Sequence, residues 1–379
     1  MGTKADNRQY HEFIIGANGR LTGLARLRTI QLLCGVTAYA IFVAESFMKR
    51  MLLAALLMVM PFASSAQEGP VYGAELEGFE YPYPVKYYEF QSQGKALRMA
   101  YLDVAAEGTA NGRTAVLMHG KNFCAASWVG TIQALTKAGY RVIAPDQIGF
   151  CKSTKPDFYQ FSFHQLAANT RGLLDSLKIE KVTVMGHSMG GMVATRFALI
   201  YPDQVEQLVL ANAIGLEDWK TKGVPYQTVD KWYEGELQTS ADRIRAYQKA
   251  TYYVGDWKPD YDKWVEMQAG MYRGEGKKLV AWNSALTYEM IYTQPVFYEF
   301  EQLKMPVLLL IGEKDNTAIS KALAPAELRK NLGVYAKLGK EIAARIPNAT
   351  LVTFEDLGHS PQIHAPERFH EALLKGLAK

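Results

Sequence analysis

The sequence predicts an α/β protein with a mostly parallel sheet, helices on both faces and a helical cap inserted near the middle. Short apolar runs typical of buried strands alternate with amphipathic helical runs over most of the chain, which favours parallel strands joined by helices. Between residues 214 and 300 this alternation stops and no clear strand pattern is present. The chain has 379 residues, of which 49% are hydrophobic, enough to bury a large core.

The expected elements follow one another in a regular order. Two strands with period-2 alternation, at 85–92 and 96–104, flank a Gly-Lys turn and predict a hairpin. Strands are then expected at 114–120, 140–146, 181–187 and 205–213, with helices at 125–139, at 161–177 and after Ser188. Beyond the cap we expect a strand at 305–315, a long helical segment at about 326–345, a strand at 349–359 and a final helix at 366–377. The chain after the leader therefore divides into a first core part (67–213), the cap (214–300) and a second core part (301–379).

The cap is rich in aromatic residues. It contains five of the six tryptophans, namely Trp219, Trp232, Trp257, Trp264 and Trp282. Because large aromatic side chains mostly serve packing, we expect most of them to form the core of the cap. A second interpretation stays open, in which some of them face a ligand cavity.

Residues 1–66 are interpreted as a leader. From Met48 the chain reads MKRMLLAALLMVMPFASSA, with the basic start, short apolar core and small-residue cleavage site of a secretory signal peptide. Because a signal peptide belongs at an N-terminus, we expect it to occupy 48–66 and residues 1–47 to be an over-extended reading frame. The rival interpretation is an N-terminal membrane hairpin, but its first arm contains Gln31, Gly35 and Glu45 and is a poor spanning segment. The leader predicts a periplasmic or secreted protein with no stable membrane span in the mature chain.

The charge of the chain is concentrated in this leader. Of 42 basic and 38 acidic residues, residues 1–66 hold seven and three, so the remaining chain holds 35 of each sign. The net charge of +4 thus belongs to the leader, and the rest of the chain has no basic excess. This distribution argues against a nucleic-acid partner.

The stretch KVTVMGHSMGGMVATRFAL, residues 181–199, changes from a buried-strand pattern to a helical pattern at Ser188. Small residues stand at Gly186 and Gly190, where a side chain would obstruct a tight turn. A strand, a sharp turn with serine at its centre and a helix are typical of a nucleophile elbow, which exposes the hydroxyl at the helix N-terminus. A serine with only a structural role in a turn requires none of this context. We therefore predict that Ser188 is a nucleophile.

A serine nucleophile needs a base to take its proton and an acid to orient that base. His359 lies in the loop after the last strand, and Asp315 lies just past the end of the preceding strand. Asp356 is the competing acid, but a residue only three positions from His359 in a loop usually points away from it. We predict the triad Ser188, His359 and Asp315.

The reaction also needs hydrogen-bond donors for the developing oxyanion. The backbone amide of Lys121, which follows His119-Gly120 at a strand end, and that of Met189, which follows the nucleophile, are the predicted pair. The alternative is an ordinary strand-to-helix loop without this role.

The motifs HGKNF, DQIGFCKS, GHSMGG, GEKD and LGHSP occur in this order, and over residues 85–378 the chain resembles the α/β-hydrolase superfamily. The resemblance implies an eight-stranded sheet with a lid over Ser188. Cys151 stands where relatives often have glycine. The elbow GHSMG resembles that of serine esterases with a single-glycine oxyanion loop. Epoxide hydrolases and haloalkane dehalogenases differ, because their nucleophile is aspartate. Prolyl iminopeptidases usually have the elbow Gly-Gly-Ser-Trp-Gly, and carbon–carbon hydrolases have asparagine before the serine.

The predicted function is hydrolysis of a small-molecule carboxylic ester through an acyl-enzyme on Ser188. Aminopeptidase, acyltransferase and carbon–carbon hydrolase activities remain alternatives within this fold, as does a ligand-binding receptor that is not an enzyme. The sequence has no phosphate loop, dinucleotide motif or metal-spaced His/Cys cluster, so no cofactor and no metal are expected. Substrate identity and oligomeric state are left open.

A disulfide between Cys124 and Cys151 is a further expectation from the resemblance. Removal of the leader removes Cys34 and leaves these two cysteines in an oxidising compartment. In the resembled fold, the strands before the two cysteines are neighbours, so their loops emerge side by side. Two buried free thiols are the alternative.

Overall fold

The computed structural model describes residues 69–377. The predicted leader, with its signal peptide at 48–66 and with Cys34, lies outside the described residues. Within them, every helix is too short or too polar to cross a membrane.

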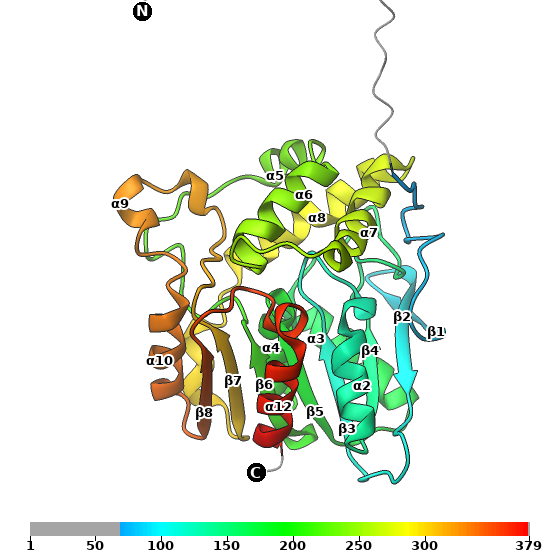
Figure 1. The fold of residues 1–379 in the computed structure, drawn as a ribbon. Coiled ribbons are helices and arrows are strands. Elements are labelled where there is room, and N and C mark those ends of the chain that lie inside the picture. The colour runs from blue at the N-terminus through cyan, green and yellow to red at the C-terminus, as the bar shows by residue number, and fades with distance from the viewer. Residues whose placement is uncertain (1–68, 378–379) are drawn as a thin grey trace, which may run out of the picture. The chain divides into compact units, whose positions relative to one another are not determined.

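The centre of the fold is one sheet of eight strands, as the resemblance implies (Figure 1). Their order across the sheet is β1-β2-β4-β3-β5-β6-β7-β8. β1 and β2 form the predicted antiparallel hairpin, β2 is also antiparallel to β4, and all other neighbours are parallel. The strands are β1 (Val85–Ser92), β2 (Lys95–Val104), β3 (Thr114–Met118), β4 (Arg141–Pro145), β5 (Val182–His187), β6 (Val205–Ala211), β7 (Val307–Gly312) and β8 (Ala349–Phe354).

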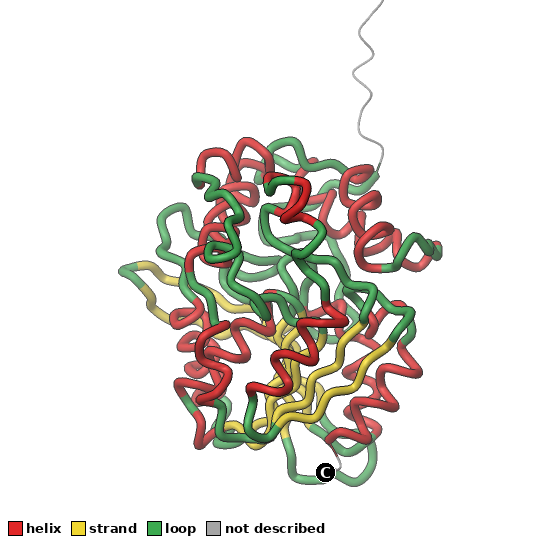
Figure 2. The backbone as a smooth tube through the Cα atoms, turned by 90° about the vertical axis from the view of Figure 1, so that its left-hand side faces the viewer, coloured by secondary structure: helices red, strands yellow, loops and turns green. Residues whose placement is uncertain are grey.

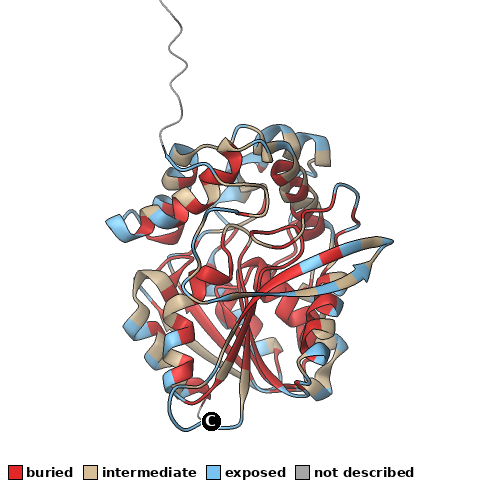
Figure 3. Cartoon of the chain, turned by 90° about the vertical axis from the view of Figure 1, so that its right-hand side faces the viewer, coloured by how far each residue is buried: buried red, intermediate tan, exposed pale blue. Residues whose placement is uncertain are grey.

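Helices cover both faces of the sheet, because successive strand residues point to opposite sides. In β6, Leu208 and Leu210 belong to one buried cluster and Val209 belongs to the other. The Val209 face is covered by α2 (Val129–Lys137) and α12 (Pro366–Leu377), and the opposite face by α3 (Phe163–Ser176), α4 (Met189–Ile200) and α10 (Tyr335–Arg345). The central strands are buried, whereas parts of the β1–β2 hairpin are exposed (Figure 3).

The segment between β6 and β7, which the structure describes in full, contains helices and no strand. It includes α5 (Val229–Glu236), α6 (Ala241–Tyr247), α7 (Asp262–Arg273) and α8 (Lys277–Thr293), which lie above the sheet (Figures 1 and 2). Its aromatic residues serve both expected purposes. Trp264 is buried in the core, whereas Trp232, whose ring stacks on Tyr288, lines a cavity.

The predicted long helix at 326–345 is wrong in its middle. The structure has two helices there, α9 (Ala326–Arg329) and α10, separated by residues 330–334. In this break the backbone amide of Gly333 donates a 2.8 Å hydrogen bond to the carboxylate of Glu217, which lies after β6 and is buried. The amide of Gly333 therefore donates to a residue more than 100 positions away, whereas in a continuous helix it would donate to a backbone carbonyl of the same helix.

Candidate active site

Ser188 lies at the sharp turn between β5 and α4. Its backbone has φ 55° and ψ −124°, a strained conformation for a residue other than glycine. A Cβ on Gly186 would lie 2.2 Å from the carbonyl oxygen of Gly190, and a Cβ on Gly190 would lie 2.1 Å from that of Met118. The two glycines thus permit the close packing of strand, turn and helix that a nucleophile elbow requires.

His359 and Asp315 form a buried pair at the same edge of the sheet. The Nδ1 atom of His359 lies 2.6 Å from Oδ2 of Asp315, and the residues are 1% and 2% exposed. This contact directs the second ring nitrogen, Nε2, away from the acid, and Nε2 makes no hydrogen bond within residues 69–377. Ser188 and His359 line the same cavity. The described residues contain no hydrogen bond between them, and such bonds are often long before a substrate binds.

Asn212 orients Asp315, and it is not among the residues predicted from the sequence. Its Nδ2 atom donates a 2.9 Å hydrogen bond to Oδ2 of Asp315, and its Oδ1 atom accepts from the amide of Gly312 at 2.9 Å. The amide of Thr317 donates to the other carboxylate oxygen at 2.8 Å. Its position directly after the buried strand β6 could have indicated this role. Parallel strands end at one edge of the sheet, so a polar side chain there lies near the residues that follow β5 and β7.

The competing acid, Asp356, lies on the surface. Both of its oxygens accept from the guanidinium of Arg368, at 2.7 and 2.9 Å, and its side chain is 63% exposed. The hydrogen bond from Arg368 lowers the pKa of this carboxyl. Asp356 is thus engaged away from His359.

The loop of His359 is held from two directions. Its backbone amide donates to the carbonyl of Thr251 in the cap at 3.1 Å, and its carbonyl lies 2.7 Å from Nε2 of His187. Thr251 belongs to a π-helical turn, Gln248–Tyr252, and such turns are frequent at functional sites. The cap therefore contributes directly to the placement of the candidate base.

The predicted oxyanion donors belong to the elbow and to the loop after β3. A Cβ on Gly120 would lie 2.9 Å from Cβ of Ser188, so the loop after β3 packs directly onto the elbow. Within residues 69–377, the amides of Lys121 and Met189 donate no backbone hydrogen bond, and Met189 begins α4. Both amides are available to a developing oxyanion.

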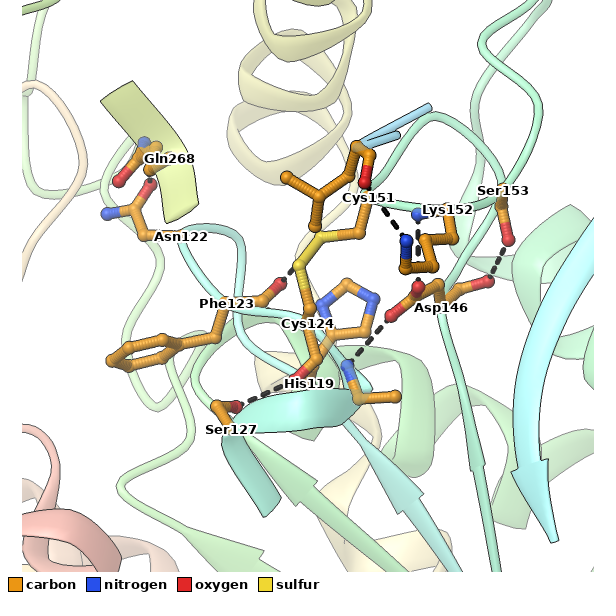
Figure 4. The surroundings of a disulfide bond; sticks show 12 residues. His119, Asn122, Phe123, Cys124, Ser127, Asp146, Cys151, Lys152, Ser153 and Gln268 are labelled. Carbon is orange, nitrogen blue, oxygen red and sulfur yellow. Dashed lines mark hydrogen bonds between the residues drawn. A yellow bond between two sulfur atoms is a disulfide. The ribbon is translucent and has the colours of Figure 1, made fainter. Parts of the chain in front are cut away.

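Cys124 and Cys151 are joined by a disulfide, with their Cα atoms 5.9 Å apart (Figure 4). The bridge connects the loop after β3 to the loop after β4. A second connection lies beside it, because the carboxylate of Asp146 accepts from the amides of Ala125 and Lys152 at 2.7 and 3.1 Å. The segment that carries Lys121 is therefore fixed immediately downstream of the predicted oxyanion donor.

The ligand atoms of Cys124, Asp146 and Cys151 lie within 4.8 Å of one another, as those of a metal site can. Two facts argue for a structural role. The cysteines are joined, so they offer no thiolate, and both oxygens of Asp146 accept hydrogen bonds, one of them also from Tyr81 at 2.6 Å.

Removal of the disulfide is expected to destabilise the protein. The two cysteines are 27 positions apart. A disulfide that closes a loop of this size stabilises the folded protein by about 3 kcal/mol, because it lowers the conformational entropy of the unfolded chain. We expect the double variant Cys124→Ala/Cys151→Ala to melt roughly 5 °C or more below the oxidised wild type. The turnover number should fall only a few-fold, because Asp146 still holds the loop. Equal melting temperatures of the two proteins would contradict this role.

Lys121, Ser188 and His359 line a cavity of about 580 Å³ between the sheet and the cap. Its walls are mainly apolar and aromatic, with Ile214, Trp232, Tyr252, Tyr288 and Ile291 among them. A cavity of this size, lined by apolar groups with few polar ones, is typical of a small-molecule site.

The family model of the α/β hydrolase fold matches residues 115–366. The chain belongs to the α/β hydrolase fold family. Among solved structures, the chain is similar to a probable hydrolytic enzyme from Pseudomonas aeruginosa, with 67% identity and a TM-score of 0.81, covering 82% of this chain and 99% of that one. An esterase from Exiguobacterium antarcticum shares 21% identity and the fold, with a TM-score of 0.59 over 75% of this chain and 97% of its own.

A curated relative is the 2-hydroxy-6-oxononadienedioate/2-hydroxy-6-oxononatrienedioate hydrolase of Paraburkholderia phymatum. It is 27% identical over 298 residues, which cover 78% of this chain and 96% of the relative. The names of these three proteins all describe hydrolytic enzymes.

Proposed function

We propose that this protein hydrolyses carboxylic esters through an acyl-enzyme formed on Ser188. The observation that carries the proposal is the buried His359–Asp315 pair, whose histidine lines the same cavity as a serine held in a strained elbow. A triad is recognised by this geometry and these roles rather than by sequence position.

In the proposed first step, Oγ of Ser188 attacks the ester carbonyl carbon as its proton passes to Nε2 of His359. Asp315 keeps the proton of Nδ1 in place and stabilises the imidazolium. The amides of Lys121 and Met189 donate to the oxyanion. As the tetrahedral intermediate collapses, the carbon–oxygen bond breaks and His359 gives its proton to the departing alkoxide. Water, deprotonated by His359, then releases the acid and restores Ser188.

Carbon–carbon bond hydrolysis is the second candidate, and the relative from Paraburkholderia phymatum favours it. The same three side chains can serve that reaction. The residue before the nucleophile argues for the ester, because the chain has His187 where the carbon–carbon hydrolases considered above have asparagine. The Nε2 atom of His187 lies within hydrogen-bond distance of the carbonyl oxygen of His359.

A panel of p-nitrophenyl esters of increasing acyl length, assayed beside 2-hydroxy-6-oxononadienedioate, separates the two activities. We expect at least one ester to be hydrolysed with the higher kcat/KM. A higher kcat/KM for the dienedioate than for every ester would overturn the ester assignment and retain the serine hydrolase.

We also propose that the enzyme is exported. The predicted signal peptide and the disulfide support this, because disulfides persist in oxidising compartments. N-terminal sequencing of protein recovered from the periplasm or medium should read from about Gln67. A mature chain that starts well before that residue would contradict the signal-peptide interpretation.

A further inference from the structure

The charged residues that line the active-site cavity are all basic. They are Lys121, Lys321 and Arg329, and the described residues that line the cavity include no aspartate and no glutamate. An apolar cavity strengthens the field of the charges at its wall, because its low dielectric screens them weakly.

Lys121 is the most enclosed of the three, with a side chain 9% exposed. Its ammonium donates to Oγ of Ser284 and lies 3.6 Å from the centre of the Tyr288 ring. Its one ion-pair partner among residues 69–377 is Glu236, whose Oε1 atom is 3.9 Å away. The other oxygen of Glu236 accepts from the hydroxyl of Tyr272, so this carboxylate is shared.

A buried ammonium is stable when a counter-charge contacts it closely. At 3.9 Å, Glu236 is beyond hydrogen-bond distance, and the ring of Tyr288 compensates only part of the charge. Burial lowers the pKa of Lys121, and the charge of Glu236 opposes this shift. The positive charge of Lys121 is therefore only partly compensated, and an anion bound in the cavity would compensate the rest.

The other two cations, Lys321 and Arg329, are placed less favourably for direct contact with a bound ligand. The ammonium of Lys321 already donates to the carbonyls of Asn316 and Leu332, at 3.0 and 2.7 Å. Arg329 is exposed, and it makes no ion pair within residues 69–377. Both add to the positive potential of the cavity, whereas Lys121 can contact a ligand beside the nucleophile.

We infer that the natural substrate is a carboxylate-bearing ester, and that the ammonium of Lys121 binds this carboxylate while the same residue's amide serves the oxyanion. The inference rests on the proposed ester hydrolysis and specifies its substrate class. It makes Lys121 a specificity-determining residue.

The test compares charged and neutral esters of matched shape. For a carboxylate on the acyl side, mono-p-nitrophenyl glutarate is paired with p-nitrophenyl pentanoate, in which a methyl group replaces the carboxylate. For the alcohol side, p-carboxyphenyl pentanoate is paired with p-carbamoylphenyl pentanoate. In wild type, we expect the charged ester to have about 10-fold or higher kcat/KM in at least one pair, as a hydrogen bond to a charged group allows.

Lys121→Met is expected to lower the ratio of charged to neutral kcat/KM about 10-fold in that pair, whatever its effect on the two separate rates. Lys121→Arg should retain most of the preference. The control is Lys337→Met on α10, which removes the same charge from a side chain that is 73% exposed, and which should leave the ratio unchanged. Should Lys121→Met fail to fold, Lys121→Gln takes its place, because its amide can still bond to Ser284, and it is expected to lower the ratio by a similar factor.

The possible failures are distinguishable. Wild-type hydrolysis of neutral esters with a ratio at or below one in both pairs overturns the inference and retains the esterase. A wild-type preference that neither Lys121→Met nor Lys121→Gln changes overturns the role of Lys121. Absence of hydrolysis for every ester overturns the proposed function itself.

Discussion

Replacement of Ser188 with alanine is expected to lower kcat for ester hydrolysis by about 10⁴-fold or more, because the attacking oxygen is lost. The fold should be retained. Within residues 69–377, the side chain of Ser188 forms no hydrogen bond that alanine would remove, and alanine keeps the Cβ that the elbow already accommodates. Kinetics with the best ester of the panel and a thermal melt test both parts of this expectation.

The matched control is Ser176→Ala on α3, which removes a hydroxyl bonded to the carbonyl of Leu173. It should leave kcat within about twofold of wild type, since surface changes away from a functional site have small effects. Substantial turnover by purified Ser188→Ala would mean that another group acts as the nucleophile.

The second large effect is expected for Asp315→Asn, which should lower kcat by about 10³- to 10⁴-fold, as loss of the triad acid does in serine proteases. In this protein Oδ2 of Asp315 accepts from both Nδ1 of His359 and Nδ2 of Asn212. An amide cannot satisfy both donors at that position without losing a contact of the other oxygen, so the imidazole would lose its tautomer or its orientation.

Asp356→Asn is the control for this assignment and should change kcat less than about twofold. Its carboxylate is exposed and paired with Arg368, so the variant loses a surface ion pair of small energetic value. A larger loss of kcat for Asp356→Asn than for Asp315→Asn would reverse the assignment of the acid.

The sheet and the elbow were predictable because their signals are local. Continuous apolar runs predict the strands from β3 to β8, and the glycines around Ser188 predict the turn. The positions of Asp315 and His359 also follow from local order, since each lies after a strand and parallel strands end at one edge. In the structure Asp315 contacts His359, whereas Asp356 contacts Arg368.

The remaining features depend on contacts between distant segments, which a periodic pattern does not encode. The helix predicted at 326–345 is interrupted at Gly333 by a hydrogen bond to Glu217. Asn212 orients Asp315 across 103 positions, and the cap holds His359 through the carbonyl of Thr251. The environment of Lys121 likewise depends on distant segments, because Glu236 belongs to α5 and Tyr288 to α8.

The role of Ser188 as nucleophile is tested most directly by the mass of the folded protein after treatment with a fluorophosphonate, followed by peptide mapping. We expect a single covalent adduct, located on Ser188, in the wild type. We expect no adduct in Ser188→Ala or in unfolded wild type, because reactivity requires the elbow, His359 and the oxyanion donors together. Folded wild-type protein that gains no adduct would instead favour a ligand-binding protein of this fold, and an adduct on another residue would contradict the assignment of the nucleophile.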